Sequence, residues 1–201
     1  AGASLRAGKE PGETDLRLQV QEPPRYTASI FIDNHGSVST GEQRVGLNLG
    51  VFSLFGSADR LTILALGSRG ARNASGAYEF PVNRRGGRLK LRHTQGTIEI
   101  IDGPFSDLSV EGDSSITQLT FDQPLARTDA LWRDLTLSAS RSDSETTIVG
   151  QSLSEFTTDR VSAALRFTGF LPDRQWTLRQ GVEYVQIENV FGTESNYSFL
   201  E

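Results

Sequence analysis

The chain has 201 residues, with 20 Lys and Arg against 25 Asp and Glu, and a formal net charge of −5. It contains no cysteine, which excludes a disulfide scaffold and a thiolate metal site. The charge is too small to indicate a nucleic-acid partner, and two histidines, His35 and His93, supply few metal ligands or general bases. A hydrophobic share of 36 % is, by composition alone, typical of a rather polar, soluble β protein.

Residues 1–24 form a unit distinct from the rest. Leu16, Leu18 and Val20 alternate with polar residues and predict one short strand. Pro23 and Pro24 follow, and paired prolines hold a chain extended and cannot continue a hydrogen-bonded ladder. A lone strand cannot be a domain. We therefore expect residues 1–24 to be the end of one domain plus a linker, and residues 25–201 to belong to a second.

From residue 26 onward the apolar residues recur with a period of two, which predicts strands and no helix. In the clearest example, Val45, Leu47 and Leu49 share one face while Arg44 and Asn48 share the other. Turn residues divide the chain into nine predicted strands at 26–33, 42–52, 60–68, 76–82, 88–97, 114–123, 131–141, 159–170 and 175–188, and a tenth begins near Asn196.

Strand length and loop length together favour a membrane barrel. Many of the strands approach the roughly 9–11 residues that cross a bilayer when tilted. Taken alternately, the connections at 54–59, 83–87, 125–129 and 171–174 are compact. The other set comprises 34–41, 69–75, 98–113 and 142–158, most of which are longer and richer in polar residues. Short turns at one rim and longer loops at the other are typical of outer-membrane barrels. The fold class expected is all-β, an antiparallel transmembrane β-barrel.

In such a barrel the polar face of each strand would line the lumen. The lumen-lining candidates are cations on that face: Arg44, Arg88, Lys90, Arg92, Arg160, Arg166 and Arg179. They would hydrate a channel and give an unfolded polypeptide no continuous apolar surface, although any polar lumen would contain such residues. Aromatic residues near strand ends, namely Trp132, Trp176, Tyr26, Tyr78 and Tyr184, would join interfacial girdles.

Two other classes of function remain open from the residues alone. In a soluble or surface-attached β-sandwich that binds a ligand, apolar and polar residues would also alternate with period two along each strand. A barrel enzyme would need Ser or Asp partners around His35 or His93. Asp33 and His35 lie two residues apart and could form an Asp–His pair. However, Asn34 and Gly36 in the same segment favour a turn, because both residue types accept positive φ. We therefore expect no catalytic residue, no metal site and no cofactor.

Short motifs in chain order resemble the outer-membrane transporters of two-partner secretion, the haemolysin secretion/activation family (ShlB/FhaC/HecB) of the Omp85 superfamily. The first hairpin motif comprises Asp33, Asn34, Gly36, Thr40 and Gly41, followed by Arg44. The other matching motifs are 11–16 with Val20, 24–26, 54–56 with Asp59, 78–89 around Tyr78, Pro81 and Gly87, and 121–127 around Phe121, Pro124 and Arg127.

The resemblance implies a fold, a function and partners. Residues 1–24 would be the last strand of a periplasmic POTRA domain and a linker, and residues 25–201 the N-terminal half of a sixteen-stranded barrel, so that the chain is a piece of a longer transporter. The parent protein would export a haemolysin, adhesin or contact-dependent toxin, captured by POTRA domains that lie outside this chain. Its other partners would be outer-membrane lipid and the barrel assembly machinery, and it would reside in the Gram-negative outer membrane.

Overall fold

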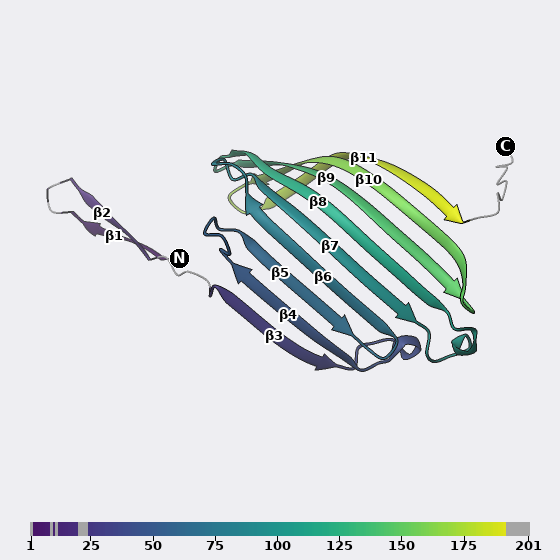
Figure 1. Ribbon diagram of the computed structural model, residues 1–201. Helices are drawn as coiled ribbons and strands as arrows, with labels where there is room; N and C mark the ends of the chain where they lie inside the picture. The colour runs from purple at the N-terminus through teal and green to yellow at the C-terminus, as the bar shows by residue number, and fades with distance from the viewer. Residues whose placement is uncertain (1, 9, 11, 20–23, 192–201) are drawn as a thin grey trace, which may run out of the picture.

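A computed structural model describes residues 2–8, 10, 12–19 and 24–191 (Figure 1). The strands are β1 (Gly2–Ala7), β2 (Thr14–Gln19), β3 (Tyr26–Asp33), β4 (Arg44–Phe52), β5 (Arg60–Gly67), β6 (Ala71–Pro81), β7 (Arg88–Glu99), β8 (Glu111–Arg127), β9 (Leu131–Ile148), β10 (Gln151–Phe170) and β11 (Gln175–Phe191). Two 3-10 turns, η1 (Val38–Thr40) and η2 (Ser106–Leu108), lie in loops. Strands β3 to β11 form one sheet in chain order, every pair antiparallel, while β1 and β2 form a separate hairpin. The described residues contain no helix long and apolar enough to cross a membrane.

All nine strands predicted from residue 26 onward are present, and β3 has the predicted bounds. The predicted tenth strand near Asn196 lies outside the described residues. The sequence pattern missed β1, which pairs with β2 so that Leu5 lies opposite Leu16. The strand expected alone within residues 1–24 therefore has a partner. Leu5, Leu16 and Leu18 remain exposed on this hairpin. Because an isolated two-stranded hairpin is at best marginally stable, these leucines indicate a surface that needs further packing.

The connections at one end of the nine-stranded sheet agree with the prediction, and those at the other end differ from it. One end, the turn rim, carries the connections 53–59, 82–87, 128–130 and 171–174, close to the compact turns that were expected. The other end, the loop rim, carries 34–43, 68–70, 100–110 and 149–150. The predicted long loops 69–75 and 142–158 are wrong, and 98–113 is shorter than predicted, because most of these polar residues continue the strands. A ladder requires only backbone hydrogen bonds, so polar side chains on both faces do not end it.

The asymmetry between the rims lies instead in strand length. Strands β3 to β5 have 8 or 9 residues, whereas β8 to β11 have 17 to 20. Strands β9 and β10 are joined by Val149 and Gly150, both with positive φ, as in the tight turns that suit β-hairpins. The extra length of β8 to β11 is therefore at the loop rim (Figure 1).

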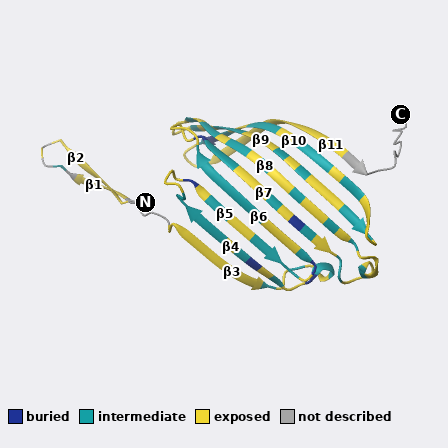
Figure 2. Cartoon of the chain, viewed as in Figure 1, coloured by how far each residue is buried: buried dark blue, intermediate teal, exposed yellow. Residues whose placement is uncertain are grey.

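The sheet is a single layer with two unlike faces. The register places Tyr26, Val51, Leu61, Tyr78 and Leu91 in one row on the apolar face, continued by Leu119, Ala139, Val161 and Tyr184. The polar face is the more crowded one along β9, where Ser138, Ser140 and Ser142 are half-buried while the alternate residues are exposed (Figure 2). The sheet therefore curls with its polar face inward. We call the two faces the inward and the outward face.

No hydrophobic residue is buried within the described part of the chain. Ile30, Ile32, Val45, Val161 and Val182 are each more than half exposed, and all belong to the outward face. An apolar surface of this extent is far larger than a soluble monomer presents to water, so it requires an apolar covering. The low hydrophobic share of the sequence therefore does not indicate a soluble protein, because only alternate residues need to be apolar in a one-layer sheet.

At the turn rim, Asp59 holds the connection between β4 and β5. It has no exposed surface, and its carboxylate accepts hydrogen bonds from the Phe55 amide (3.2 Å), the Ser57 amide (3.3 Å) and the Tyr78 hydroxyl (3.0 Å). Phe55 meets the Tyr78 ring edge-on, at 6.1 Å between centroids. Burial raises the pKa of the Asp59 carboxyl, but the hydrogen bonds from Tyr78 and the two amides outweigh burial and lower the pKa below 3.8.

At the loop rim, backbone hydrogen bonds join neighbouring loops into a continuous rim belt. The Gly70 amide donates to the Thr40 carbonyl (2.7 Å), and the Glu99 amide donates to the Gly70 carbonyl (2.7 Å). The Ile101 amide donates to the Ser39 carbonyl (2.8 Å), and the Val149 amide to the Leu108 carbonyl (3.1 Å). The belt thus connects 34–43, 68–70, 100–110 and the β9–β10 turn, and satisfies amides that the strands leave unpaired.

Asp59 makes stability depend on pH in a defined direction. Because its folded pKa is below its unfolded value of about 3.9, its contribution is complete above that value and is lost as the pH falls through the folded pKa. We expect the melting temperature of the intact protein to fall more steeply between pH 5 and about pH 3 than that of Asp59→Asn. Thermal melting across this range is the measurement. Asp129→Asn, at an exposed turn of the same rim, serves as control and should follow the wild type; equal slopes for wild type and Asp59→Asn would contradict the assignment.

Gly70 is required by the close approach of backbones in the rim belt. A Cβ at this position would lie 2.4 Å from the Glu99 carbonyl oxygen and 3.2 Å from the Thr40 Cα. We expect Gly70→Ala to lower the free energy of unfolding by about 1–3 kcal/mol, as overpacking does elsewhere. Urea unfolding of the intact protein measures this. Gly76→Ala is the matched control, because its Cβ would meet nothing within 4 Å. A Gly70→Ala variant as stable as Gly76→Ala would refute the role of the belt.

Candidate functional site

The seven cations selected from the sequence all lie on the inward face. Lys90 and Arg92 project from β7 on the same side as Thr120 and Gln118 of β8, and the register extends this face across β9 to Arg160 of β10. Arg44, Arg88, Arg166 and Arg179 occupy the same face by the same alternation. The antiparallel ladder therefore places on one face seven cations from four strands, β4, β7, β10 and β11, which the sequence could place only one strand at a time.

Four of the seven cations are bound by three carboxylates on neighbouring strands. Arg44 binds Asp33 through two hydrogen bonds, Nε to Oδ1 at 2.8 Å and Nη2 to Oδ2 at 3.0 Å, at the loop-rim end of β3 and β4. Arg88 and Lys90 both bind Glu79 of β6, with the Lys90 Nζ at 3.1 Å. Arg160 binds Glu183 of β11 at 3.2 Å. These pairs are partly exposed, so each contributes little to stability, and their main effect is to fix the side chains.

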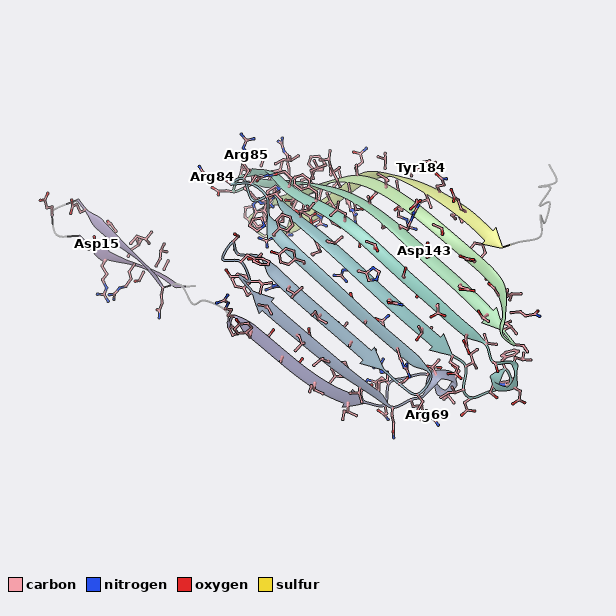
Figure 3. The ribbon with its side chains drawn as sticks, viewed as in Figure 1. Asp15, Arg69, Arg84, Arg85, Asp143 and Tyr184 are labelled. Atoms are coloured by element: carbon pink, nitrogen blue, oxygen red, sulfur yellow. The ribbon has the colours of Figure 1, made fainter. Side chains whose placement is uncertain are left out.

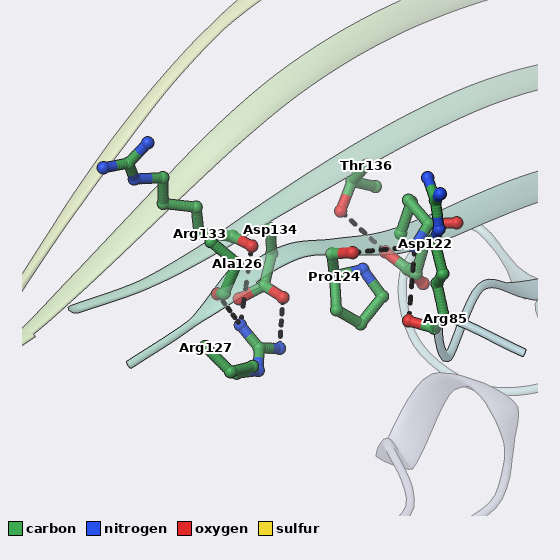
Figure 4. A network of polar contacts seen from close by, with 9 residues as sticks. Arg85, Asp122, Pro124, Ala126, Arg127, Arg133, Asp134 and Thr136 are labelled. Atoms are coloured by element: carbon green, nitrogen blue, oxygen red, sulfur yellow. Dashed lines mark hydrogen bonds and ion pairs between the residues drawn. The ribbon is translucent and has the colours of Figure 1, made fainter. Parts of the chain in front are cut away.

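The other three, Arg92, Arg166 and Arg179, form no ion pair among the described residues. Arg166 and Arg179 lie directly opposite each other on β10 and β11. Asp134 lies opposite Arg166 on β9, but it is bound by Arg127. Figure 4 shows the pair of Arg127 and Asp134 near the turn rim, where Arg127 also donates to the carbonyls of Ala126 and Arg133. The inward face is therefore most positive at the turn-rim end of β10 and β11.

The turn-motif residues belong to the hairpin between β3 and β4 and support the rim belt. Asp33 accepts a hydrogen bond from the His35 amide (3.0 Å) in addition to the Arg44 pair. The Gly36 amide donates to the Glu42 carbonyl (2.9 Å), which closes the loop. Gly41 has a φ of 99°, and Thr40 supplies a belt carbonyl. No contact is recorded for the Asn34 side chain within the described region. These residues shape the loop between β3 and β4.

The two histidines lie on different elements. His35 lies in the β3–β4 loop, while His93 lies on the outward face of β7, where its Nδ1 hydrogen bonds with the Thr117 hydroxyl at 2.9 Å. No cluster of three or more His, Asp or Glu side chains that could hold a metal ion occurs in 2–8, 10, 12–19 or 24–191.

Four of the five girdle residues occupy the outward face as expected, and Trp132 does not. Tyr26, Tyr78, Trp176 and Tyr184 lie in outward rows of the register. Trp132 lies inward, where its ring meets Phe170 at 4.7 Å between centroids and the Arg127 guanidinium at 4.9 Å. A bulge between Pro124 and Ala126 near the end of β8 precedes this turn. The girdle prediction for Trp132 is wrong because a strand-end position does not reveal which face a side chain occupies.

The apolar band of the outward face ends before the long strands do. On β9 and β10 its last row contains Ala139 and Val161, and the next row is the ion pair Arg141 to Asp159, with Nη2 to Oδ2 at 2.6 Å. Beyond it the outward residues are polar, beginning with Asp143. Figure 3 shows Tyr184 and Asp143 on β11 and β9, Arg84 and Arg85 at the turn rim, and Arg69 at the loop rim. On the outward face, the part of β8 to β10 nearest the loop rim is therefore mainly polar.

A row of hydroxyl side chains on β9 was not singled out from the sequence. Every inward residue from 136 to 146 is serine or threonine, namely Thr136, Ser138, Ser140, Ser142, Ser144 and Thr146. The signal is visible in the sequence as a period-two series. The half of the series from Ser142 to Thr146 falls within the segment expected to be a loop, so the predicted strand ended at residue 141.

Known proteins resemble this chain over most of its length. The profile of the haemolysin secretion/activation protein family ShlB/FhaC/HecB matches residues 12–197. The heme/hemopexin transporter protein HuxB of Haemophilus influenzae Rd is 23 % identical over 198 residues, which are 98 % of this chain and 34 % of HuxB. HuxB of strain 86-028NP is 27 % identical over 115 residues, 57 % of this chain and 20 % of that protein. The chain therefore spans about a third of the length of HuxB from strain Rd.

Two solved structures have a similar fold. CdiB from Escherichia coli superposes with a TM-score of 0.72 at 20 % identity, covering 98 % of this chain and 38 % of CdiB. CdiB from Acinetobacter baumannii gives a TM-score of 0.59 at 16 % identity, covering 94 % of this chain and 38 % of that one. With the family profile extending over residues 12–197, the chain belongs to the haemolysin secretion/activation protein family ShlB/FhaC/HecB, a family of outer-membrane β-barrel transporters of Gram-negative bacteria.

Proposed function

We propose that this chain forms part of the barrel of a two-partner secretion translocator that exports a large secreted protein across the outer membrane. The observation that carries the proposal is the division of one curled sheet into an outward apolar face and an inward face with seven cations. A lipid bilayer supplies the apolar covering that the outward face requires. A soluble β-sandwich is not favoured, because the described residues bury no hydrophobic side chain.

The inward face lines the passage in this proposal. Arg44, Arg88, Lys90 and Arg160 are held by carboxylates, so the wall is hydrated and nearly balanced in charge over much of its area. An unfolded polypeptide would meet hydroxyl, amide and paired ionic groups on it. Such a wall does not adsorb apolar segments, which would otherwise stall in the channel.

The turn rim faces the periplasm and the loop rim faces the medium. Outer-membrane barrels have short turns on the periplasmic side, and the strands extend past the lipid on the outer side. The polar extension of β8 to β11 beyond the row of Arg141 and Asp159 supports this orientation. The belt of the loop rim would then stiffen the exit.

Residues 1–24 are the end of a periplasmic POTRA domain plus a linker, and 25–201 the N-terminal half of the barrel. The exposed leucines of the β1–β2 hairpin support this division, because they form a surface for packing within a larger domain. POTRA domains would capture the secretion signal of the partner by adding it as a strand, a recognised mode of peptide binding. The barrel assembly machinery would insert the protein into the membrane.

The exported partner is a large exoprotein of the haemolysin, adhesin or contact-dependent toxin type. The name of the relative HuxB, a heme/hemopexin transporter protein, adds a haem-related exoprotein as a second class of cargo. The test compares culture supernatants of cells with and without the intact translocator gene. We expect one large secreted protein to disappear on disruption and to return on complementation. Unchanged supernatants under all growth conditions that express the gene would overturn the proposal.

The assignment of the two faces predicts the reactivity of single introduced cysteines. The chain contains no cysteine, so each new thiol is unique within it. Arg92 and Leu91 are neighbours on β7 that point inward and outward, respectively. In the intact protein in lipid vesicles, we expect Arg92→Cys to react with a charged, membrane-impermeant thiol reagent at least about tenfold faster than Leu91→Cys, because only the hydrated thiol ionises readily. Mass spectrometry of the adduct measures both rates. Equal rates would refute a lipid-facing Leu91.

A further inference from the structure

The outward face is hollowed near its loop-rim end, where a depression lies over β4 to β7. Its volume of about 520 Å³ falls within the roughly 300–1,000 Å³ of small-molecule sites. Two neighbouring register rows cross this outward depression, one of Leu47, Ala65, Ala74 and Gln95, and one of Val45, Gly67, Arg72 and Thr97. Ala65, Gly67 and Ala74 are smaller than their neighbours on β4 and β7, so the surface is lowest between those strands.

The outward depression has an apolar wall and a polar wall side by side. On β4 and β5, every outward residue is apolar or glycine. On β7, the last apolar outward residue is Leu91, and the next three are His93, Gln95 and Thr97. One wall therefore suits hydrocarbon, while the other offers side chains that donate and accept hydrogen bonds.

Arg72 supplies a positive charge at the loop-rim border of the depression. It follows Ala74 as the first polar residue on the outward face of β6, and it is exposed. Among the described residues it forms neither an ion pair nor a side-chain hydrogen bond, although Glu99 of β7 and Asp113 of β8 are the nearest carboxylates in the register. The outward faces of β4, β5 and β6 carry no carboxylate.

The cation is of the kind that binds phosphate. A guanidinium presents its N–H groups as a planar fork that matches phosphate oxygens. Arg69, in the loop 68–70, places a second exposed cation at the same rim (Figure 3). A basic group beside an apolar surface is a recurrent way of recognising a lipid head group.

Three features of the depression together specify its occupant. A soluble anion would leave the apolar wall uncovered, and a hydrocarbon chain alone would leave Arg72, Gln95 and Thr97 without partners. The outer leaflet of a Gram-negative outer membrane consists mainly of a phosphorylated glycolipid. This lipid carries acyl chains, sugar hydroxyls and phosphate groups, which correspond to the apolar wall, the polar wall and the cation.

We propose that the outward depression binds one molecule of the phosphorylated glycolipid of the outer leaflet, with acyl chains against β4 and β5 and a phosphate on Arg72. The proposal rests on the orientation given under the proposed function, with the loop rim toward the medium, and not on the identity or passage of the exported protein. The bound lipid would hold the short strands β4 and β5 at a fixed depth in the membrane.

Native mass spectrometry of the full-length translocator in detergent tests the proposal. The probe is bisphosphorylated lipid A, the membrane-embedded part of the glycolipid, and the fraction of protein carrying it gives the dissociation constant. We expect Arg72→Gln to bind the probe at least about tenfold more weakly, because hydrogen bonds between charged groups are lost. Ala74→Trp fills the depression and should weaken binding by a similar factor.

Two matched controls carry the same changes elsewhere on the outward face. Arg133→Gln is on β9 near the turn rim, and Ala28→Trp is on β3. Both should bind the probe within about twofold of the wild type, since surface substitutions away from a contact change free energies little. Heat-modifiable migration in a gel verifies that each variant forms a barrel, and Ala74→Leu replaces Ala74→Trp if the latter does not.

Lipid A without phosphate groups separates a contact from an indirect effect. We expect the wild type to bind it at least about tenfold more weakly than the bisphosphorylated form, and Arg72→Gln to bind the two forms equally, as a thermodynamic cycle requires for groups in contact. A loss of affinity in Arg72→Gln for both forms would overturn the phosphate contact.

Two competing sources of phosphate are tested in the same way. Inorganic phosphate lacks acyl chains, and phosphatidylglycerol lacks phosphorylated sugars. We expect inorganic phosphate not to displace the probe, and phosphatidylglycerol to bind several-fold more weakly than the probe. Displacement by inorganic phosphate, or equal binding of phosphatidylglycerol, would overturn the glycolipid as the occupant, and so would equal binding of the probe by the wild type and Arg72→Gln.

Orientation is measured separately, so that its failure is distinguishable from failure of the site. Asp107 is exposed in η2 at the loop rim, and the chain contains no cysteine. We expect Asp107→Cys to react with a membrane-impermeant thiol reagent on intact cells. Reaction only after the outer membrane is permeabilised would refute the orientation in the proposed function, whereas binding of lipid A in detergent does not depend on orientation.

Discussion

The register of the antiparallel ladder is the constraint on which the rest of the structure depends. Side chains alternate between faces with a period of two, so a slip of one residue in any pair would move apolar residues inward and cations outward. Nine strands hold this register over a sheet without a buried hydrophobic residue among those described. The stability that a core provides elsewhere must come from backbone hydrogen bonds, rim contacts and the apolar medium around the outward face.

Each rim secures the register in a different way. At the turn rim, the buried carboxylate of Asp59 gathers two backbone amides and the Tyr78 hydroxyl, and so fixes where β5 starts relative to β6. At the loop rim, the belt through Thr40, Gly70 and Glu99 ties loops together by backbone contacts alone. The Asp33 to Arg44 pair fixes the first hairpin beside this belt. The wall between the rims is left free to carry function.

Two different observations support the proposed function. One is membership of an outer-membrane transporter family, and the other is the division of the sheet into an apolar and a polar face. The family profile rests on residue identity along the chain, whereas the division of the faces rests on hydrogen-bond register. The charge pattern of the inward face adds a polarity, since Arg166 and Arg179 oppose each other near the turn rim without a carboxylate partner among the described residues. A polypeptide that entered at the turn rim would first meet the more positive part of the wall.

The sequence by itself determined the fold class, the nine strands and the face on which Arg44, Arg92 and Arg166 lie, because a period-two alternation is a local property. It failed for 69–75 and 142–158, where polar residues occur on both faces and the local signal is that of a loop. The tertiary structure alone decided that these segments stay in the ladder and that Trp132 points inward. It also decided which carboxylate neutralises each cation, since Asp33, Glu79 and Glu183 are chosen by register between strands. Pairing across strands joins positions that are distant in the sequence, and the alternation within a single strand does not determine it.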